Sequence, residues 1–295
     1  MAFKHLDLIN SFLRGTNTTE VNEYFRGDID ESGYLDYKIG EETLKKYSIF
    51  RNLSTYLTVS KTDGKIIVPT STDIAGVMQE GDSFPVSEED FDELDFSSYK
   101  LGSIIKVKQD FVSDNDFNLI NYLDNELGKR FGKAEERLIL NGTGNNEPLG
   151  LLNLELDGVQ TSSVTYDSIT NLYFSLANDY RNDAVFIVSD EIAVTLRKLK
   201  DEDGNYLWNQ NNDTIFGKKV YISNYMTNST KPILFGNFSY LWIIHRKRLA
   251  LKVLQELYAN NYQIGYAAKE RLDFKLTEPN AVRVLSIQEV ETSQE

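Results

Sequence analysis

The chain has 295 residues, of which 31 are basic and 45 acidic, giving a net charge of −14. Its hydrophobic content of 41% is enough for a substantial core and indicates one large folded domain or two ordinary ones. The negative charge argues against a protein that wraps nucleic acid, because such proteins need a basic surface to displace phosphate counterions. The lack of cysteine excludes thiolate catalysis and cysteine-ligated metals, and two histidines leave few groups for a metal site.

Residues 1–50 predict a helix followed by an arm. Apolar side chains recur at helical spacing before Gly15, at Phe3, Leu6, Ile9, Phe12 and Leu13. Residues 15–40 are rich in Gly, Asn, Thr, Asp and Ser, so we expect an extended or partly disordered arm able to lie across a neighbouring subunit. No run of about 18 uncharged apolar residues occurs, so we expect neither a membrane span nor a signal peptide.

Residues 51–110 predict a β-rich projection. Segments 55–59 and 65–69 flank the turn residues 61–64, whose Asp-Gly pair is typical of a hairpin. Residues 66–99 contain nine carboxylates and no lysine or arginine, yet aromatic and aliphatic side chains are interleaved with the acids. We expect this segment to dock on a partner, and residues 99–107 to pair with the outgoing strand as a long two-stranded ribbon.

Residues 111–150 predict a long helix and the turn that ends it. The apolar positions recur every three or four residues at Ile120, Leu123, Leu127, Phe131, Ala134 and Leu138. Ser113, Asp114 and Asp116 are candidate caps, and Gly128 with Gly132 would permit close approach of another backbone. The helix should end at Asn141 and Gly142, because Pro148 prevents its continuation.

The second half of the chain predicts alternating helices and strands. We expect a helix over residues 167–180 capped by Asp167, a strand at 184–188, and a helix to residue 199 capped by Ser189 or Asp190. Further strands are predicted at residues 220–223, 233–235, 240–245, 249–254, 272–276 and 282–287. This pattern is typical of a mixed α+β protein.

The motifs that resemble catalytic or ligand-binding sites are all incomplete. The glycine-rich residues 141–150 lack the Gly-Lys-[Ser/Thr] that binds phosphate and magnesium, and residues 201–204 lack the spaced ligands of a calcium loop. The acids at 88–95 lie on one segment and do not supply two carboxyl groups across a pocket, and no Gly-x-Ser-x-Gly elbow occurs. We therefore predict no active site, no cofactor and no metal, and interpret the basic residues 246–248 as a solvated turn.

The order of these segments resembles the major capsid proteins of tailed bacteriophages, which have the Hong Kong 97-type fold. The resemblance covers about residues 40–287. Its most specific part runs from Ile187-Val-Ser-Asp190 through Leu199-Lys-Asp-Glu-Asp-Gly-Asn-Tyr206, followed by Phe216-Gly-Lys-Lys-Val-Tyr-Ile222. The turn Asn141-Gly-Thr-Gly-Asn-Asn-Glu-Pro-Leu-Gly150 and the segments Ala267-Ala-Lys-Glu-Arg271 and Leu272-Asp-Phe-Lys-Leu-Thr-Glu-Pro279 also match.

The resemblance implies an N-terminal arm, an extended loop, a spine helix in a peripheral domain, and an axial domain at the capsomer centre. It assigns residues 1–50 to the N-terminal helix and arm, 51–110 to the extended loop with flanking strands, and 111–150 to the spine helix. Residues 151–260 would form the axial domain, and 261–295 the return strands of the peripheral domain and the C-terminal tail. The resemblance also implies a separate scaffolding protein or a processed chain, since about 40 residues precede the match.

Some members of this family cross-link their subunits through a loop lysine and a distant asparagine, assisted by a glutamate. In this sequence Tyr262 stands at the asparagine position and Lys269 at the glutamate position, so the resemblance does not predict a cross-link. Lys61 or Lys65 with Asn260 or Asn261 would be the remaining candidates.

The resemblance implies a non-enzymatic function: self-assembly, as pentamers and hexamers, into the icosahedral head shell around double-stranded DNA. We expect portal and scaffolding partners, a decoration protein, weak non-specific contact with packaged DNA, and location in the virion after assembly in the host cytoplasm. The alternatives are an encapsulin-type nanocompartment shell and, more distantly, a carbohydrate-binding or hydrolysing enzyme. We predict that the acidic segment meets cations of the next subunit's helix, through Glu80, Asp82, Phe84, Glu88, Glu89, Asp90 and Phe91 on one side and Lys129, Arg130 and Lys133 on the other.

Overall fold

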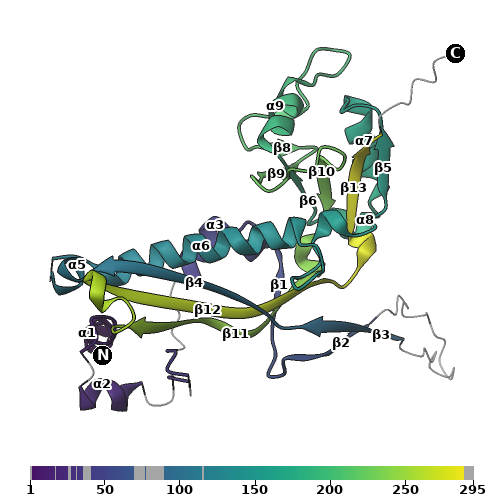
Figure 1. Ribbon diagram of the computed structural model, residues 1–295. Coiled ribbons are helices and arrows are strands. Elements are labelled where there is room, and N and C mark those ends of the chain that lie inside the picture. Colours follow the sequence, from purple (N-terminus) through teal and green to yellow (C-terminus); the bar gives the residue numbers. More distant parts are fainter. Residues whose placement is uncertain are drawn as a thin grey trace, which may run out of the picture.

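A long helix lying on a twisted sheet organises the fold (Figure 1). The structure is a computed structural model that describes residues 2–16, 18–25, 28–30, 32–35, 41–69, 77, 90–114 and 116–288. The helix α6 (Leu119–Asn141) runs along a four-stranded sheet, and a second, seven-stranded sheet stands at the C-terminal end of α6. A two-stranded ribbon extends from the end of the first sheet that lies opposite α1.

The sequence predicted α6 closely, but not its cap. The Asn118 side chain accepts a hydrogen bond from the Asn121 amide at 3.1 Å, whereas Ser113 ends the separate short helix α5 (Gln109–Ser113). The predicted caps Ser113, Asp114 and Asp116 are therefore wrong, because the chain bends between the two helices. At the other end Gly142 fits closely, since a Cβ atom there would lie 2.1 Å from the Pro148 carbonyl oxygen.

The four-stranded sheet has the order β1-β11-β12-β4. Its strands are β1 (Thr55–Thr58), β4 (Tyr99–Lys108), β11 (Leu241–Leu254) and β12 (Gln263–Leu276). The antiparallel pair β11–β12 forms the long centre, where the two predicted strands at 240–245 and 249–254 are one strand with bulges. The 3₁₀ turn Ala259–Asn261 joins β11 to β12, and β4 forms the edge.

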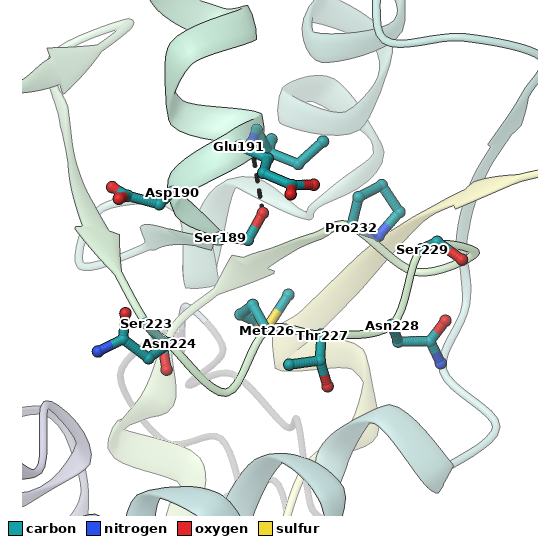
Figure 2. Close-up of a pocket in the computed structure, with 11 residues that line it drawn as sticks. Ser189, Asp190, Glu191, Ser223, Asn224, Met226, Thr227, Asn228, Ser229 and Pro232 are labelled. Carbon is teal, nitrogen blue, oxygen red and sulfur yellow. Dashed lines mark hydrogen bonds between the residues drawn. The ribbon is translucent and has the colours of Figure 1, made fainter.

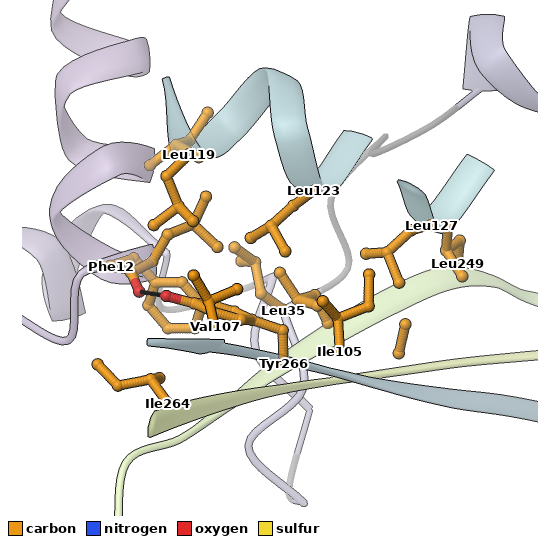
Figure 3. Packing of buried hydrophobic residues seen from close by; sticks show 14 of the residues in the cluster. Phe12, Leu35, Ile105, Val107, Leu119, Leu123, Leu127, Leu249, Ile264 and Tyr266 are labelled. Atoms are coloured by element: carbon orange, nitrogen blue, oxygen red, sulfur yellow. Dashed lines mark hydrogen bonds between the residues drawn. The ribbon is translucent and has the colours of Figure 1, made fainter. Parts of the chain in front are cut away.

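Leucines on one side of α6 fill the space between the helix and this sheet (Figure 3). Leu119, Leu123 and Leu127 are at most 1% exposed and pack in one cluster with Ile105 and Tyr266 of the sheet. The Tyr266 hydroxyl donates a hydrogen bond to the Leu13 carbonyl at 2.9 Å, which ties the N-terminal helix to the same core. From Leu119 to Leu127, about every turn of α6 therefore removes a leucine from water.

The N-terminal residues form more regular structure than predicted. Helix α1 (Ala2–Leu13) confirms the predicted helix, and α2 (Thr19–Tyr24), capped by Thr18, lies within the segment predicted as an irregular arm. Helix propensity alone does not predict α2. This short helix is stabilised by tertiary packing, because Val21 is buried in the same hydrophobic cluster as the leucines of α6. Helices α3 (Glu41–Tyr47) and α4 (Phe50–Leu53) follow.

Helix α3 packs closely on α6 at Gly132, as the predicted backbone approach required. A Cβ atom at Gly132 would lie 3.1 Å from the Tyr47 Cβ and 3.2 Å from the Leu44 carbonyl oxygen. The glycine therefore sets the distance between the two helices.

The predicted hairpin at residues 55–69 is wrong. Strand β1 pairs in parallel with β11, while β2 (Asp63–Pro69) pairs with β3 (Phe91–Ser97). The Asp-Gly pair that suggested a turn lies inside β2, because β1 gains more by joining a buried strand than by forming a hairpin. The ribbon is therefore β2–β3, and the predicted return strand 99–107 is β4, which pairs with β12 instead.

The seven-stranded sheet has the order β5-β13-β10-β6-β9-β8-β7. Its strands are β5 (Gly158–Thr161), β6 (Val185–Val188), β7 (Trp208–Asn209), β8 (Thr214–Ile215), β9 (Lys218–Ile222), β10 (Ile233–Gly236) and β13 (Val282–Ile287). Three α-helices belong to this region: α7 (Tyr166–Ser175), α8 (Asn178–Arg181) and α9 (Asp190–Lys198). Further 3₁₀ turns lie at Leu151–Asn153, Phe238–Tyr240 and Pro279–Ala281.

Local sequence signals predicted most helices and strands of the region around the seven-stranded sheet. Ser189 caps α9 and the buried strand β6 appears where predicted, but α7 is capped by Thr165 rather than Asp167. Thr165 wins because its hydroxyl and that of Ser168 form a reciprocal capping box. Strand pairing crosses the predicted boundary at residue 260: β11 before it pairs with β12 after it, and β13 pairs with β10.

A buried ion cluster joins α4, α6 and β12. The Arg51 Nε donates to Glu135 Oε2 at 2.7 Å, a second contact joins Arg51 Nη2 to Glu135, and Arg51 Nη2 lies 3.7 Å from Glu270 Oε2. The side chains of Glu135 and Glu270 are at most 1% exposed. Burial, together with the charge of Glu135, raises the pKa of Glu270 well above its usual value. One guanidinium therefore faces two carboxyl groups, one of which holds its proton readily.

We expect Leu123→Ala to lower the free energy of unfolding by about 2–5 kcal/mol, because it leaves a cavity between α6 and the sheet. Urea unfolding of the dissociated subunit measures this loss. The exposed neighbour Asn121→Ala serves as the control and should change stability by less than about 0.5 kcal/mol. Equal effects of the two substitutions would contradict this account of the core.

We expect Glu270→Gln to make the subunit less sensitive to alkaline pH. The folded chain holds a proton that the unfolded chain loses above a pKa of about 4.3, so the free energy of unfolding falls as pH rises from there toward the raised pKa. Glutamine resembles the protonated acid, and the variant should therefore gain on the natural chain between pH 5 and pH 8. Urea unfolding of both proteins at pH 5 and pH 8 tests this, with exposed Glu42→Gln as the control. A difference in the free energy of unfolding between variant and natural chain that does not change with pH would refute it.

Candidate assembly surfaces

The outer face of the ribbon exposes apolar and acidic side chains together. Side chains alternate along β2, so Ile66 and Val68 are buried while Lys65 and Ile67 point outward. Ile67 is 62% exposed and Phe91 58%. The Glu93 carboxylate binds the Lys65 ammonium and raises its pKa mainly through that hydrogen bond.

The inner face of the ribbon packs on its own chain. Ile66 and Phe96 are buried against Ile244 of β11, with Leu94 and Trp242 packed beside them. The Asp273 carboxylate accepts a hydrogen bond from the Ser97 amide at 2.9 Å, where β3 leads into β4. The base of the ribbon is therefore anchored, and only its outer face is available to a partner.

Four cations form a stripe on the exposed side of α6, at Lys129, Arg130, Lys133 and Arg137. Lys129, Lys133 and Arg137 are four residues apart and Arg130 lies three before Lys133, so all four lie on one side of the helix. Arg130 donates to the Ile104 carbonyl at 3.3 Å and lies 3.8 Å from Glu126, and Arg137 lies 3.4 Å from Glu147. Within the described part of the chain, Lys129 and Lys133 have no ion pair. We call these four residues the α6 stripe.

A second basic surface lies on the side of the sheet away from α6. Alternation along β4 buries Ile105 and Val107 under α6 and points Lys100, Lys106 and Lys108 outward. Ile104, on the same outward face, is 45% exposed. We call Lys100, Ile104, Lys106 and Lys108 the β4 face; it is an apolar side chain surrounded by lysines.

The arm covers the neighbouring part of this sheet surface. Lys269 pairs in register with Gly102 and so points to the same side as the β4 face. Its ammonium lies 3.1 Å from the Asp30 carboxylate and 3.4 Å from the Tyr34 ring centroid, while Leu35 and Leu251 exchange two backbone hydrogen bonds. The arm therefore places a carboxylate on this side of the sheet, and the Tyr258 ring lies 5.4 Å from the Lys106 ammonium of the β4 face.

The structure describes part of the predicted contact set. Asp90 and Phe91 lie at the start of β3, and Lys129, Arg130 and Lys133 lie on α6. The remaining predicted contacts, Glu80, Asp82, Phe84, Glu88 and Glu89, lie outside the described residues. The β4 face was not predicted, although three lysines at even positions of an alternating strand would have indicated it.

The residues considered for cross-linking are spread over the subunit. Lys65 lies on the ribbon, whereas Asn260 and Asn261 lie in the turn between β11 and β12. The ribbon and this turn are at opposite ends of the sheet (Figure 1). Tyr262 follows the turn with a φ of 51° and is 78% exposed. A bond between these groups would therefore have to join two copies of the chain.

A polar pocket of 410 Å³ lies beside the start of α9 (Figure 2). It is lined by the start of α9 and by the loop after β9, through Ser189, Asp190, Glu191, Ile192, Ser223, Asn224, Met226, Thr227, Asn228, Ser229 and Pro232. The Ser189 hydroxyl accepts a hydrogen bond from the Ile192 amide, and the Asn228 side chain accepts one from the Thr230 amide. Both groups thus stabilise the local backbone.

Among the described residues no group of three or more histidine, aspartate or glutamate side chains is placed to hold a metal ion. In the same part of the chain, no helix combines the length and the apolar surface needed to cross a membrane.

Comparison with known proteins identifies the family. The model of the phage capsid family matches residues 38–287. A search of curated proteins gave no significant match.

Solved structures share the fold at low sequence identity. The capsid of an empty GTA particle has a TM-score of 0.68 and 22% identity, covering 82% of this chain and 90% of that one. The Gordonia phage Cozz structure has a TM-score of 0.59 and 14% identity, over 82% of this chain and 87% of that one. The satellite phage P4 procapsid has a TM-score of 0.58 and 11% identity, over 83% and 96%.

These likenesses confirm the predicted α+β capsid fold and are consistent with its Hong Kong 97 type. The family match extends over most of the chain, from just before α3 to the end of β13, the last strand along the chain. The chain therefore belongs to the phage capsid family and is a major capsid protein that forms the phage head shell.

Proposed function

We propose that this capsid protein builds its shell by laying the ribbon of one subunit on the β4 face of the next. The observation that carries the proposal is the match between two surfaces of the same chain. The outer face of the ribbon has Ile67 and Phe91 beside carboxylates, and the β4 face has Ile104 beside lysines. Apolar contact at the centre with opposite charges around it is the usual composition of a specific interface.

The two surfaces of one chain cannot meet each other. The ribbon continues directly into β4 through Ser97 and Ser98 and extends away from the sheet (Figure 1). A second copy must therefore supply the β4 face. An interface burying about 1,200–2,000 Å² in total would be stable, and closure of the shell multiplies modest pair energies.

The α6 stripe is the other basic surface and was the contact predicted from the sequence. It offers four cations but no exposed aliphatic side chain among them, so it leaves Ile67 and Phe91 without an apolar partner. The β4 face provides one in Ile104. Apolar complementarity therefore favours the β4 face for the ribbon.

The wider role that we propose is structural rather than catalytic. The shell would consist of pentamers and hexamers around double-stranded DNA, with portal, scaffolding and decoration proteins as partners, first in the host cytoplasm and then in the virion. The GTA capsid described with C5 symmetry supports fivefold rings for this fold. The net charge of −14 supports weak retention of DNA.

We expect Lys106→Glu with Lys108→Glu to abolish shell formation while the subunit stays folded. The two carboxylates would face the acids of the docking ribbon, and like charges oppose contact. Negative-stain microscopy with light scattering measures assembly, and circular dichroism measures folding. Lys198→Glu with Lys200→Glu, on the seven-stranded body, is the control with the same change in charge.

A swap provides the decisive comparison. Adding Glu93→Lys and Asp95→Lys, whose side chains lie on the outer face beside Ile67 and Lys65, to the β4 variant should restore shells, since the charges are exchanged. Normal shells from the β4 variant alone would contradict the proposed contact. The contents of the particles also separate a genome shell from a nanocompartment, because a co-purifying cargo enzyme would indicate the latter.

We expect the ribbon variant Glu88→Lys, Glu89→Lys, Asp90→Lys to fail to assemble. Its acidic residues would no longer attract the basic surface of a neighbour, whichever surface that is. Sedimentation should show a folded, dispersed subunit. Particles of normal size from this variant would refute any role for the acidic segment in assembly.

A further inference from the structure

The α6 stripe presents cations with the wrong composition for a protein interface. Lys129, Arg130, Lys133 and Arg137 lie along about 12 Å of helix, given a rise of 1.5 Å per residue. The cores of protein interfaces are depleted of charged residues and rich in aromatic ones. The stripe contains no aromatic residue, and the exposed aromatic Tyr122, at 37% exposure, lies about two turns before it. The stripe carries four cations and no exposed aliphatic side chain among them, a composition that suits a polar polyanion.

The stripe is also poorly neutralised by its own chain. Arg137 has Glu147 at 3.4 Å and Arg130 has Glu126 at 3.8 Å, both on exposed surface where such pairs are worth little. Lys129 and Lys133 have no ion pair among the described residues. In a chain of net charge −14, four adjacent cations, two of them without an ion pair among the described residues, form a local positive field.

The sheet separates this field from the β4 face. Helix α6 packs on one side of the sheet, over Ile105 and Val107, while Lys106 and Lys108 point from the other side. A ribbon docked on the β4 face therefore leaves the α6 stripe uncovered.

We infer that the α6 stripe binds the phosphate backbone of the packaged DNA. This inference rests on the proposed shell. Inside a filled head, DNA phosphate is the polyanion available to every subunit. The stripe would hold DNA without reading its sequence, since lysine and arginine contacts to phosphate carry no base information. Four contacts per subunit, repeated over the shell, are individually weak and screened by salt.

The test uses full-length subunits, kept dissociated, and a 30-base-pair duplex of mixed sequence. Binding is followed by fluorescence anisotropy between 50 and 200 mM salt. With four phosphate contacts the affinity should fall roughly 100-fold over this range, from a slope of about −0.9 per contact. Lys129→Gln, Lys133→Gln and Arg137→Gln together leave Arg130 and should reduce the fall to about fourfold. Arg130 is retained because it contacts the Ile104 carbonyl.

The control is Lys198→Gln, Lys200→Gln and Lys219→Gln, which removes the same charge from the seven-stranded body and should keep the steep salt dependence. An unchanged salt slope in the α6 variant would overturn the inference. So would binding of polyglutamate but not DNA, which would assign the stripe to an acidic protein.

Assembly of the same variants separates this inference from the proposed interface. Microscopy should show that the α6 variant forms normal shells. If it forms none although its subunit is folded, the stripe is a contact between subunits and the DNA assignment is wrong. If the β4 variant assembles normally while the α6 variant loses DNA binding, the ribbon proposal fails and the DNA inference stands.

Discussion

The burial of one side of α6 on the four-stranded sheet is the constraint on which the rest of the subunit depends. Leu123 and Leu127 are fully buried there, opposite Ile105 and Tyr266. Because side chains alternate along a strand, burying Ile105 forces Ile104 and Lys106 to the opposite side. The same packing turns the cations of α6 outward. Both basic surfaces are therefore geometric consequences of the core.

Charge separation between elements follows from this arrangement. The outer face of the ribbon carries Glu93 and Asp95, and the β4 face carries three lysines. One chain cannot bring its own ribbon onto its own β4 face. A net charge of −14 keeps free subunits apart, while opposite local charges favour one orientation of approach. Specific contact and general repulsion can thus coexist in one chain. This combination favours ordered assembly over non-specific aggregation.

The elements that the sequence predicts correctly are those set by local interactions. The period of α6, the cap of α9 by Ser189 and the buried strand β6 depend on residues within one or two turns. Sequence reasoning located the strands β1 and β4 but not their partners β11 and β12, which lie more than 150 residues away. No local signal distinguishes a strand that closes a hairpin from one that joins a distant sheet. The acids of the ribbon and the alternating lysines of β4 are both visible in the sequence, but only the sheet shows that these lysines lie on the side away from α6.

The buried cluster of Arg51, Glu135 and Glu270 lies where α4, α6 and β12 meet. An apolar cluster would cost less to bury, since desolvating charges offsets much of their attraction. A shell subunit can tolerate that cost because assembly binds only the folded chain and adds its own free energy to folding. The free subunit is then less stable than the assembled one. Stability in such a protein is shared between the core of one chain and the contacts among many.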